Sequence, residues 1–140
     1  MDKIFVSMIC AATLAGCATI PPLDKTIPIG RPSTFNADPD RYDHKVVYIR
    51  AHMATRPHWW QFFLYELPYR SDGLGCLSFE GNDWIMHNRY EIDKQFFILK
   101  GTFLKDATLN SVAGSCIHND NGFVVDEEFL KVRYGKRYPH

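Results

Sequence analysis

The sequence has no excess of charge of either sign. Sixteen Lys and Arg residues balance sixteen Asp and Glu residues over 140 positions. Proteins that bind nucleic acid usually carry a basic excess, because contacts to phosphates need Lys and Arg. The neutral balance therefore argues against a nucleic-acid partner. The basic end of the chain, residues 131–140, is predicted to be a solvated last strand.

Catalytic and metal-binding motifs are missing as well. The sequence contains neither HExxH spacing for a metal nor a GxSxG turn for a nucleophilic serine. Asp126, Glu127 and Glu128 could act as paired carboxylates on a glycan. On a strand, however, consecutive acids point to alternating faces, which favours a solvated rim. We therefore predict that the protein is not an enzyme and that it needs no cofactor and no metal.

The sequence has no apolar run long enough to cross a bilayer, which needs about 20 residues. The run from Ile4 to Ala15 instead matches the core of a secretory signal. It ends in Leu14-Ala15-Gly16-Cys17, which resembles the lipobox of bacterial lipoproteins. The resemblance implies that residues 1–16 are removed and that Cys17 carries the lipid anchor. Ala18 at the next position implies the outer membrane, with the domain facing the periplasm.

Cysteine is scarce, with four residues in the chain. Cys10 leaves with the predicted signal peptide and Cys17 is predicted to be acylated. Cys76 and Cys116 then form an even pair in an oxidising compartment, which predicts a disulfide bond. The alternative is a metal site that includes His118, but a second pair of ligands at suitable spacing is not evident.

Proline is concentrated in one segment, residues 17–41, which holds five prolines. Such a segment disfavours helices and strand pairing. We predict a semi-rigid tether over 17–41, extending from the membrane to a single domain over 42–140.

The rest of the chain is dominated by alternation of apolar and polar residues, which is typical of strands. Strands are predicted over 45–54 and 59–67, as two short strands over 76–88, and over 94–105. Gly101 would mark a bulge or bend in the last of these. A short helix is predicted over 105–114, and a hairpin over 115–134 with its turn at Asn121-Gly122. The cluster 71–75 is predicted to be a turn.

Five or six strands and one short helix predict a mainly β fold, a small closed barrel. Tyr42-Asp43-His44-Lys45 and the alternating residues after it resemble the start of OB-fold-like domains in small bacterial envelope proteins. The resemblance implies an OB-like barrel, and it transfers no functional residue.

A calcium site is the alternative for residues 117–128. Asn119, Asn121, Gly122 and Glu128 fall on EF-hand positions, but Ile117 stands where the first Asp ligand belongs. The hairpin is the preferred interpretation.

The candidate binding residues lie in the loop between the first two predicted strands. These are Arg56, His58, Trp59 and Trp60. In OB-type barrels this loop borders the binding surface, and Trp and Arg are favoured at interfaces.

The favoured function is a non-catalytic, membrane-anchored module that binds an envelope protein or glycan. The alternatives are a periplasmic inhibitor or immunity protein against a toxin or lytic enzyme, and a small hydrolase.

Overall fold

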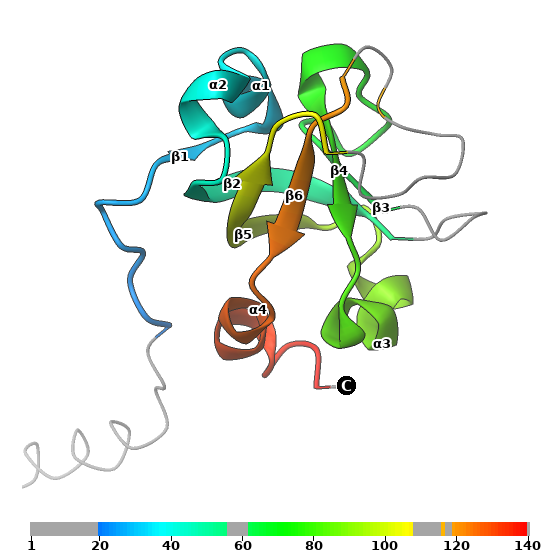
Figure 1. Cartoon of the computed structure of the whole chain (residues 1–140). Coiled ribbons are helices and arrows are strands. Elements are labelled where there is room, and N and C mark those ends of the chain that lie inside the picture. The colour runs from blue at the N-terminus through cyan, green and yellow to red at the C-terminus, as the bar shows by residue number, and fades with distance from the viewer. Residues whose placement is uncertain (1–19, 56–61, 108–115, 117–118, 140) are drawn as a thin grey trace, which may run out of the picture.

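Five strands close into a barrel in the order β2-β3-β4-β6-β5, and β5 pairs back onto β2 (Figure 1). The computed structural model describes residues 20–55, 62–107, 116 and 119–139. All neighbours are antiparallel except β4 and β6, which are parallel. The prediction of a mainly β, OB-like barrel is confirmed. The strands are β2 (Val46–Ala54), β3 (Phe62–Tyr65), β4 (Cys76–Glu80), β5 (Phe96–Leu104) and β6 (Gly122–Val125).

Alternation along the strands fills the barrel interior. In β2, Val47, Ile49, Ala51 and Met53 are completely buried, as the period-2 pattern predicts. Residues of the other strands that point inward complete the core. These are Phe62 and Leu64 of β3, Leu77 and Phe79 of β4, Phe97, Leu99 and Phe103 of β5, and Phe123 and Val125 of β6.

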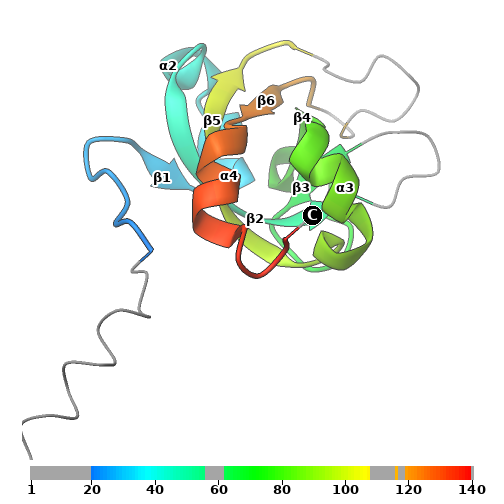
Figure 2. The same cartoon turned by 90° about the horizontal axis from the view of Figure 1, so that it is seen from below.

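Helices α3 (Asp83–Ile92) and α4 (Glu127–Tyr134) close one end of the barrel (Figure 2). The prediction of two strands over 76–88 is wrong for its second half. Asn82 accepts a hydrogen bond from the amide of Ile85 at 3.0 Å, and this cap starts a helix directly after β4. Trp84 of α3 and Phe97 of β5 both pack against Tyr138, which follows α4.

The predicted hairpin over 115–134 is wrong. Its first half contributes no strand in the residues that the structure describes, and β6 pairs with β4 and β5 instead. Its second half is a strand only over β6 and then continues as α4, because Asp126 accepts a hydrogen bond from the amide of Phe129 at 3.1 Å and so caps a helix. The basic end is accordingly helix α4 and a following turn, not a strand.

The proline-rich segment forms part of the fold from residue 29. It contains β1 (Ile29–Gly30), α1 (Pro32–Asn36) and α2 (Pro39–Tyr42). Strand β1 pairs with β2 in parallel, and Phe35 is completely buried against Phe103 at the barrel end opposite α3 and α4. The prediction of an unpaired tether is thus wrong for residues 29–41. Proline is compatible with these helices because it lies at their first position, where no amide donor is needed.

Several smaller expectations can be compared with the structure. The turn at 71–75 contains the 3-10 turn η1 (Gly73–Gly75). Gly101 lies in regular pairing within β5, where a β-carbon would come within 2.1 Å of the carbonyl oxygen of Val124. Glycine is therefore needed for close approach of the strands. The predicted helix over 105–114 lies largely outside the described residues. Within the described ranges, the helices are too short and too polar to cross a membrane.

Candidate functional site

A row of aromatic side chains crosses the outer face of β3, β2 and β5. We call it the aromatic strip, and it comprises Phe63 and Tyr65 of β3, His52 of β2 and Phe96 of β5. Tyr65 and Phe96 both lie opposite His52, on its two sides. Residues that lie directly opposite each other in antiparallel strands point to the same face. The strand register therefore gathers residues that are far apart in the sequence.

The rings of the strip contact one another. Phe63 and Tyr65 stack with ring centroids 5.9 Å apart, and His52 meets the edge of Phe96 at 5.4 Å. Phe96 is 53% exposed, while the other three side chains are half-buried. Burial raises the pKa of Tyr65 above its ordinary value, so its hydroxyl stays protonated at neutral pH. The strip is thus a mostly apolar surface.

The neighbouring outer face of β4 is covered. Cys76 lies opposite Tyr65, and its disulfide bond to Cys116 ties the β5–β6 connection onto β4. The predicted disulfide is therefore confirmed. Two residues further along β4, the hydroxyl of Ser78 donates to the carbonyl oxygen of Asn121 at 3.0 Å. The strip ends where this cover begins.

Three buried asparagines hold this cover in place. Asn36 donates to the carbonyl oxygens of Leu74 and Cys76, both at 2.8 Å. Asn119 donates to the carbonyl oxygen of Cys76, and its side-chain oxygen accepts from the amide of Asn121 at 2.8 Å. The side-chain nitrogen of Asn121 donates to the side-chain oxygen of Asn36 at 2.9 Å. The asparagines that suggested an EF-hand loop thus serve a hydrogen-bond network in the protein.

The acidic residues considered for glycan hydrolysis stabilise helix α4. Asp126 caps α4, and Glu127 and Glu128 are in its first turn, where they pair with Lys131 at 3.1 and 3.4 Å. The ion pair to Glu127 raises the pKa of Lys131. The earlier placement of these acids on alternating faces of a strand is wrong, because the segment is a helix.

The described histidines occupy three separate places. His44 pairs with Asp43 at 3.0 Å in the turn before β2, His52 belongs to the strip, and a ring nitrogen of His87 is 2.7 Å from the carbonyl oxygen of Asp83. Within the described ranges, His, Cys, Asp and Glu side chains do not gather into a group of three that could hold a metal ion.

The predicted binding residues Arg56, His58, Trp59 and Trp60 lie outside the described residues, as does Cys17. The loop that contains the first four connects β2 to β3, the strands that carry His52, Phe63 and Tyr65. Sequence reasoning missed the strip itself. The sequence indicates only one part of the strip, the aromatic residues at the outward positions of 62–65. It does not indicate that His52 and Phe96 lie together, because β2 and β5 are distant in sequence.

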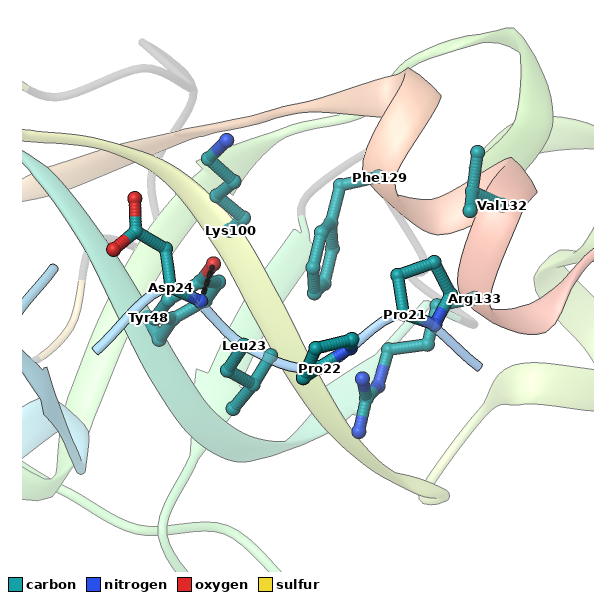
Figure 3. Close-up of a pocket in the computed structure, with 9 residues that line it drawn as sticks. All are labelled: Pro21, Pro22, Leu23, Asp24, Tyr48, Lys100, Phe129, Val132 and Arg133. Atoms are coloured by element: carbon teal, nitrogen blue, oxygen red, sulfur yellow. Dashed lines mark hydrogen bonds between the residues drawn. The ribbon is translucent and has the colours of Figure 1, made fainter. Parts of the chain in front are cut away.

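A second feature is a cavity of about 370 Å³ between the N-terminal segment and α4 (Figure 3). Phe129 and Val132 project from α4, Tyr48 comes from β2, and Lys100 comes from β5. The remaining lining residues are Pro21, Pro22, Leu23, Asp24 and Arg133.

Comparisons with protein-family models, with curated protein sequences and with solved structures gave no match.

Proposed function

We propose that the protein is a lipid-anchored, non-catalytic binding module of the bacterial envelope, and that the aromatic strip binds a protein partner. The observation that carries this proposal is the open aromatic surface across β3, β2 and β5, next to the predicted binding loop. In OB-type barrels, ligands bind on the face of the second and third strands, bordered by this loop and by the connection between the last two strands, and the strip shares the second barrel strand, β3, with that face.

The chemistry of the strip favours a protein over a glycan. A sugar site needs several polar groups that converge on the hydroxyls beside its stacking ring. The strip offers only the hydroxyl of Tyr65 and the ring of His52, whereas Phe63 and Phe96 are apolar. Leu67 and Tyr69, just beyond β3, are exposed as well. Aromatic residues in a largely apolar patch are typical of the centre of protein interfaces.

The lipid anchor is supported by the sequence alone. Leu14-Ala15-Gly16-Cys17 resembles a lipobox, and Ala18 follows it. We propose acylation at Cys17 and attachment to the outer membrane on the periplasmic side. Two or more acyl chains would hold the protein there durably, because each buried methylene contributes about 0.8 kcal/mol.

A periplasmic inhibitor or immunity protein is the second candidate, and the disulfide bond favours it. The bond between Cys76 and Cys116 fixes the β5–β6 connection beside the strip. A surface that is rigid before binding loses less conformational entropy when the complex forms. Inhibitors of toxins or lytic enzymes exploit this advantage.

The test uses photo-crosslinking in living bacteria. A photoreactive amino acid at position 96 should crosslink one defined protein, whereas the same group at position 124 should not. Val124 provides the control because it is exposed, at 39%, on β6. The crosslinked band should disappear in the variant Phe63→Ala, and it should persist in the variant Val46→Ala.

Two results would contradict the proposal. Equal crosslinking from positions 96 and 124 would show that the strip has no special role. Retention of the full chain on peptidoglycan that depends on Phe63 and Phe96, without a protein crosslink, would assign the strip to a glycan. The anchor is tested separately by incorporation of labelled palmitate, which should be lost in the variant Cys17→Ser.

A further inference from the structure

The inference concerns the face around the cavity, and it rests on the proposed acylation of Cys17. The chain is already fastened to the barrel close to that position. The backbone amide of Asp24 donates to the hydroxyl of Tyr48 at 3.1 Å (Figure 3). The carbonyl oxygen of Pro28 accepts from the amide of Tyr48 at 2.8 Å. Pro21 lines the cavity.

The remaining span to the anchor is short. Pro21 lies four positions after Cys17, and an extended chain covers at most about 3.6 Å per position. The two positions therefore lie within about 14 Å of each other. An acylated Cys17 would therefore hold the cavity and α4 at the membrane surface. A tether that continued to residue 41 would instead lift the domain away from the membrane.

The cavity combines an apolar lining with two cations. Pro22, Leu23 and Phe129 supply apolar surface, and Lys100 and Arg133 supply positive charge. Among the described residues, neither cation has a carboxylate within 4.0 Å. The guanidinium carbon of Arg133 lies 5.9 Å from the ring centroids of both Phe129 and Tyr134.

The nearby acidic side chains have partners other than Lys100 and Arg133 within 4.0 Å. The carboxylate of Asp24 accepts hydrogen bonds from the amide and hydroxyl of Thr26 at 2.9 and 2.7 Å. Glu127 and Glu128 both pair with Lys131. The cavity is therefore lined by two cations, Lys100 and Arg133, and by one carboxylate, that of Asp24, whose pKa the charge of Lys100 also lowers.

Exposed apolar side chains flank the cavity. Val132 lines it and is 62% exposed, and Ile20, next to Pro21, is 59% exposed. Apolar side chains beside cations are typical of surfaces that lie in the headgroup region of a bilayer, where the cations meet phosphates and the apolar groups reach the acyl boundary.

We propose that this face docks on the membrane, and that Lys100 and Arg133, on opposite sides of Phe129, each meet the phosphate of an anionic phospholipid at the rim of the cavity (Figure 3). The guanidinium of Arg133 suits a phosphate because its planar donors match two oxygens. Val132 and Ile20 enter the interface beside it. The anchor and the cavity then hold the barrel in one orientation, with the opposite end and α1 directed away from the lipid.

The experiment measures hydrogen exchange of the full chain, purified from membranes and reconstituted in vesicles. One set contains phosphatidylethanolamine alone, and the other contains equal parts of phosphatidylethanolamine and phosphatidylglycerol. Amides of residues 20–26 and 127–135 should be better protected in the phosphatidylglycerol vesicles. The double variant K100Q/R133Q should weaken docking by about thirtyfold, since each cation near an anionic surface contributes about fivefold.

The matched control is K45Q/K94Q, which removes two exposed lysines that do not line the cavity. It should keep the lipid-dependent protection. Unfolding of each variant in denaturant shows that the fold is intact. Equal protection of wild type in both vesicle sets, or equal loss in the control, would overturn the proposal. Protection by inorganic phosphate without vesicles, to the same degree, would reassign the cavity to a free anion.

Failure of docking and failure of anchoring are distinguishable. Intact mass reports whether Cys17 is acylated. An acylated protein without lipid-dependent protection would retain the anchor and lose the docking face. An unmodified protein whose protection by phosphatidylglycerol still depends on Lys100 and Arg133 would retain the docking face and lose the anchor.

Discussion

The outer face of β4 and the aromatic strip belong to the same barrel and follow the same alternation, yet one is covered and the other is open. On β4, Cys76 and Ser78 point outward and are buried by the β5–β6 connection. On β3, Tyr65 and Phe63 lie directly opposite them and remain partly exposed. Alternation thus decides which way a side chain points, while distant segments decide whether that side is covered. An uncovered aromatic surface is the better candidate for binding.

Removal of the disulfide bond should have the largest effect on the covered face. The bond spans 40 residues of chain. The variant Cys76→Ser with Cys116→Ser should lower the free energy of unfolding by about 4 kcal/mol, because the unfolded chain regains loop entropy. Guanidinium denaturation measures this. Wild-type protein unfolded under reducing conditions should show the same loss, and a double variant as stable as the oxidised protein would contradict the prediction.

The variant Asn121→Ala should have the next largest effect on the free energy of unfolding. Its side chain bonds to Asn36, and its oxygen accepts from the amide of Asp106 at 3.1 Å. Truncation leaves the side-chain oxygen of Asn36 buried without this hydrogen bond and frees the part-buried amide of Asp106, so the free energy of unfolding should fall by about 2–3 kcal/mol. The control is Asp120→Ala, at an exposed neighbouring position, which should change stability by about 0.5 kcal/mol or less.

Phe96→Ala separates stability from binding on the open face. Because Phe96 is 53% exposed, its truncation should change the free energy of unfolding by about 0.5–1 kcal/mol. Affinity for the crosslinked partner should fall by at least about thirtyfold, as for an aromatic hot spot. Calorimetry of the purified pair measures the affinity. A large loss of stability with unchanged affinity would place Phe96 with the covered residues.

The smallest effect concerns the N-terminal segment, which covers the outer face at Tyr48. Hydrogen bonds from Thr26 lower the pKa of Asp24 below its ordinary value of 3.8. The charged carboxylate therefore stabilises this segment fully above pH 3.8, and the contribution is lost as the pH falls through the lowered pKa. Thr26→Val should raise the pKa of Asp24 toward 3.8, as measured by NMR titration. An unchanged titration would show that the side-chain hydrogen bond is unimportant.

The errors of sequence reasoning have a common cause. The residues that follow Asn82 and Asp126 are predicted as strands, yet each of these two residues caps a helix, because a cap outweighs a short apolar pattern when the following residues can pack on the barrel end. The prolines in 29–41 predict a tether, whereas the structure packs this segment on the barrel. Phe35 lies in the same segment, and its ring is completely buried. Burial of one large aromatic side chain favours packing of the segment that carries it, and this outweighs the effect of the prolines.

The features that the sequence determined by itself do not depend on how the strands pair. Alternation in 46–54 set the inward residues of β2, two remaining cysteines set the disulfide, and the density of β-branched and aromatic residues set a mainly β fold. Tertiary structure alone decided which outward residues are covered, where Tyr65, His52 and Phe96 meet, and that Lys100 and Arg133 share one cavity. The physical reason is that these contacts join residues distant in sequence, so their formation depends on strand register and on the packing of whole segments, which local patterns do not encode.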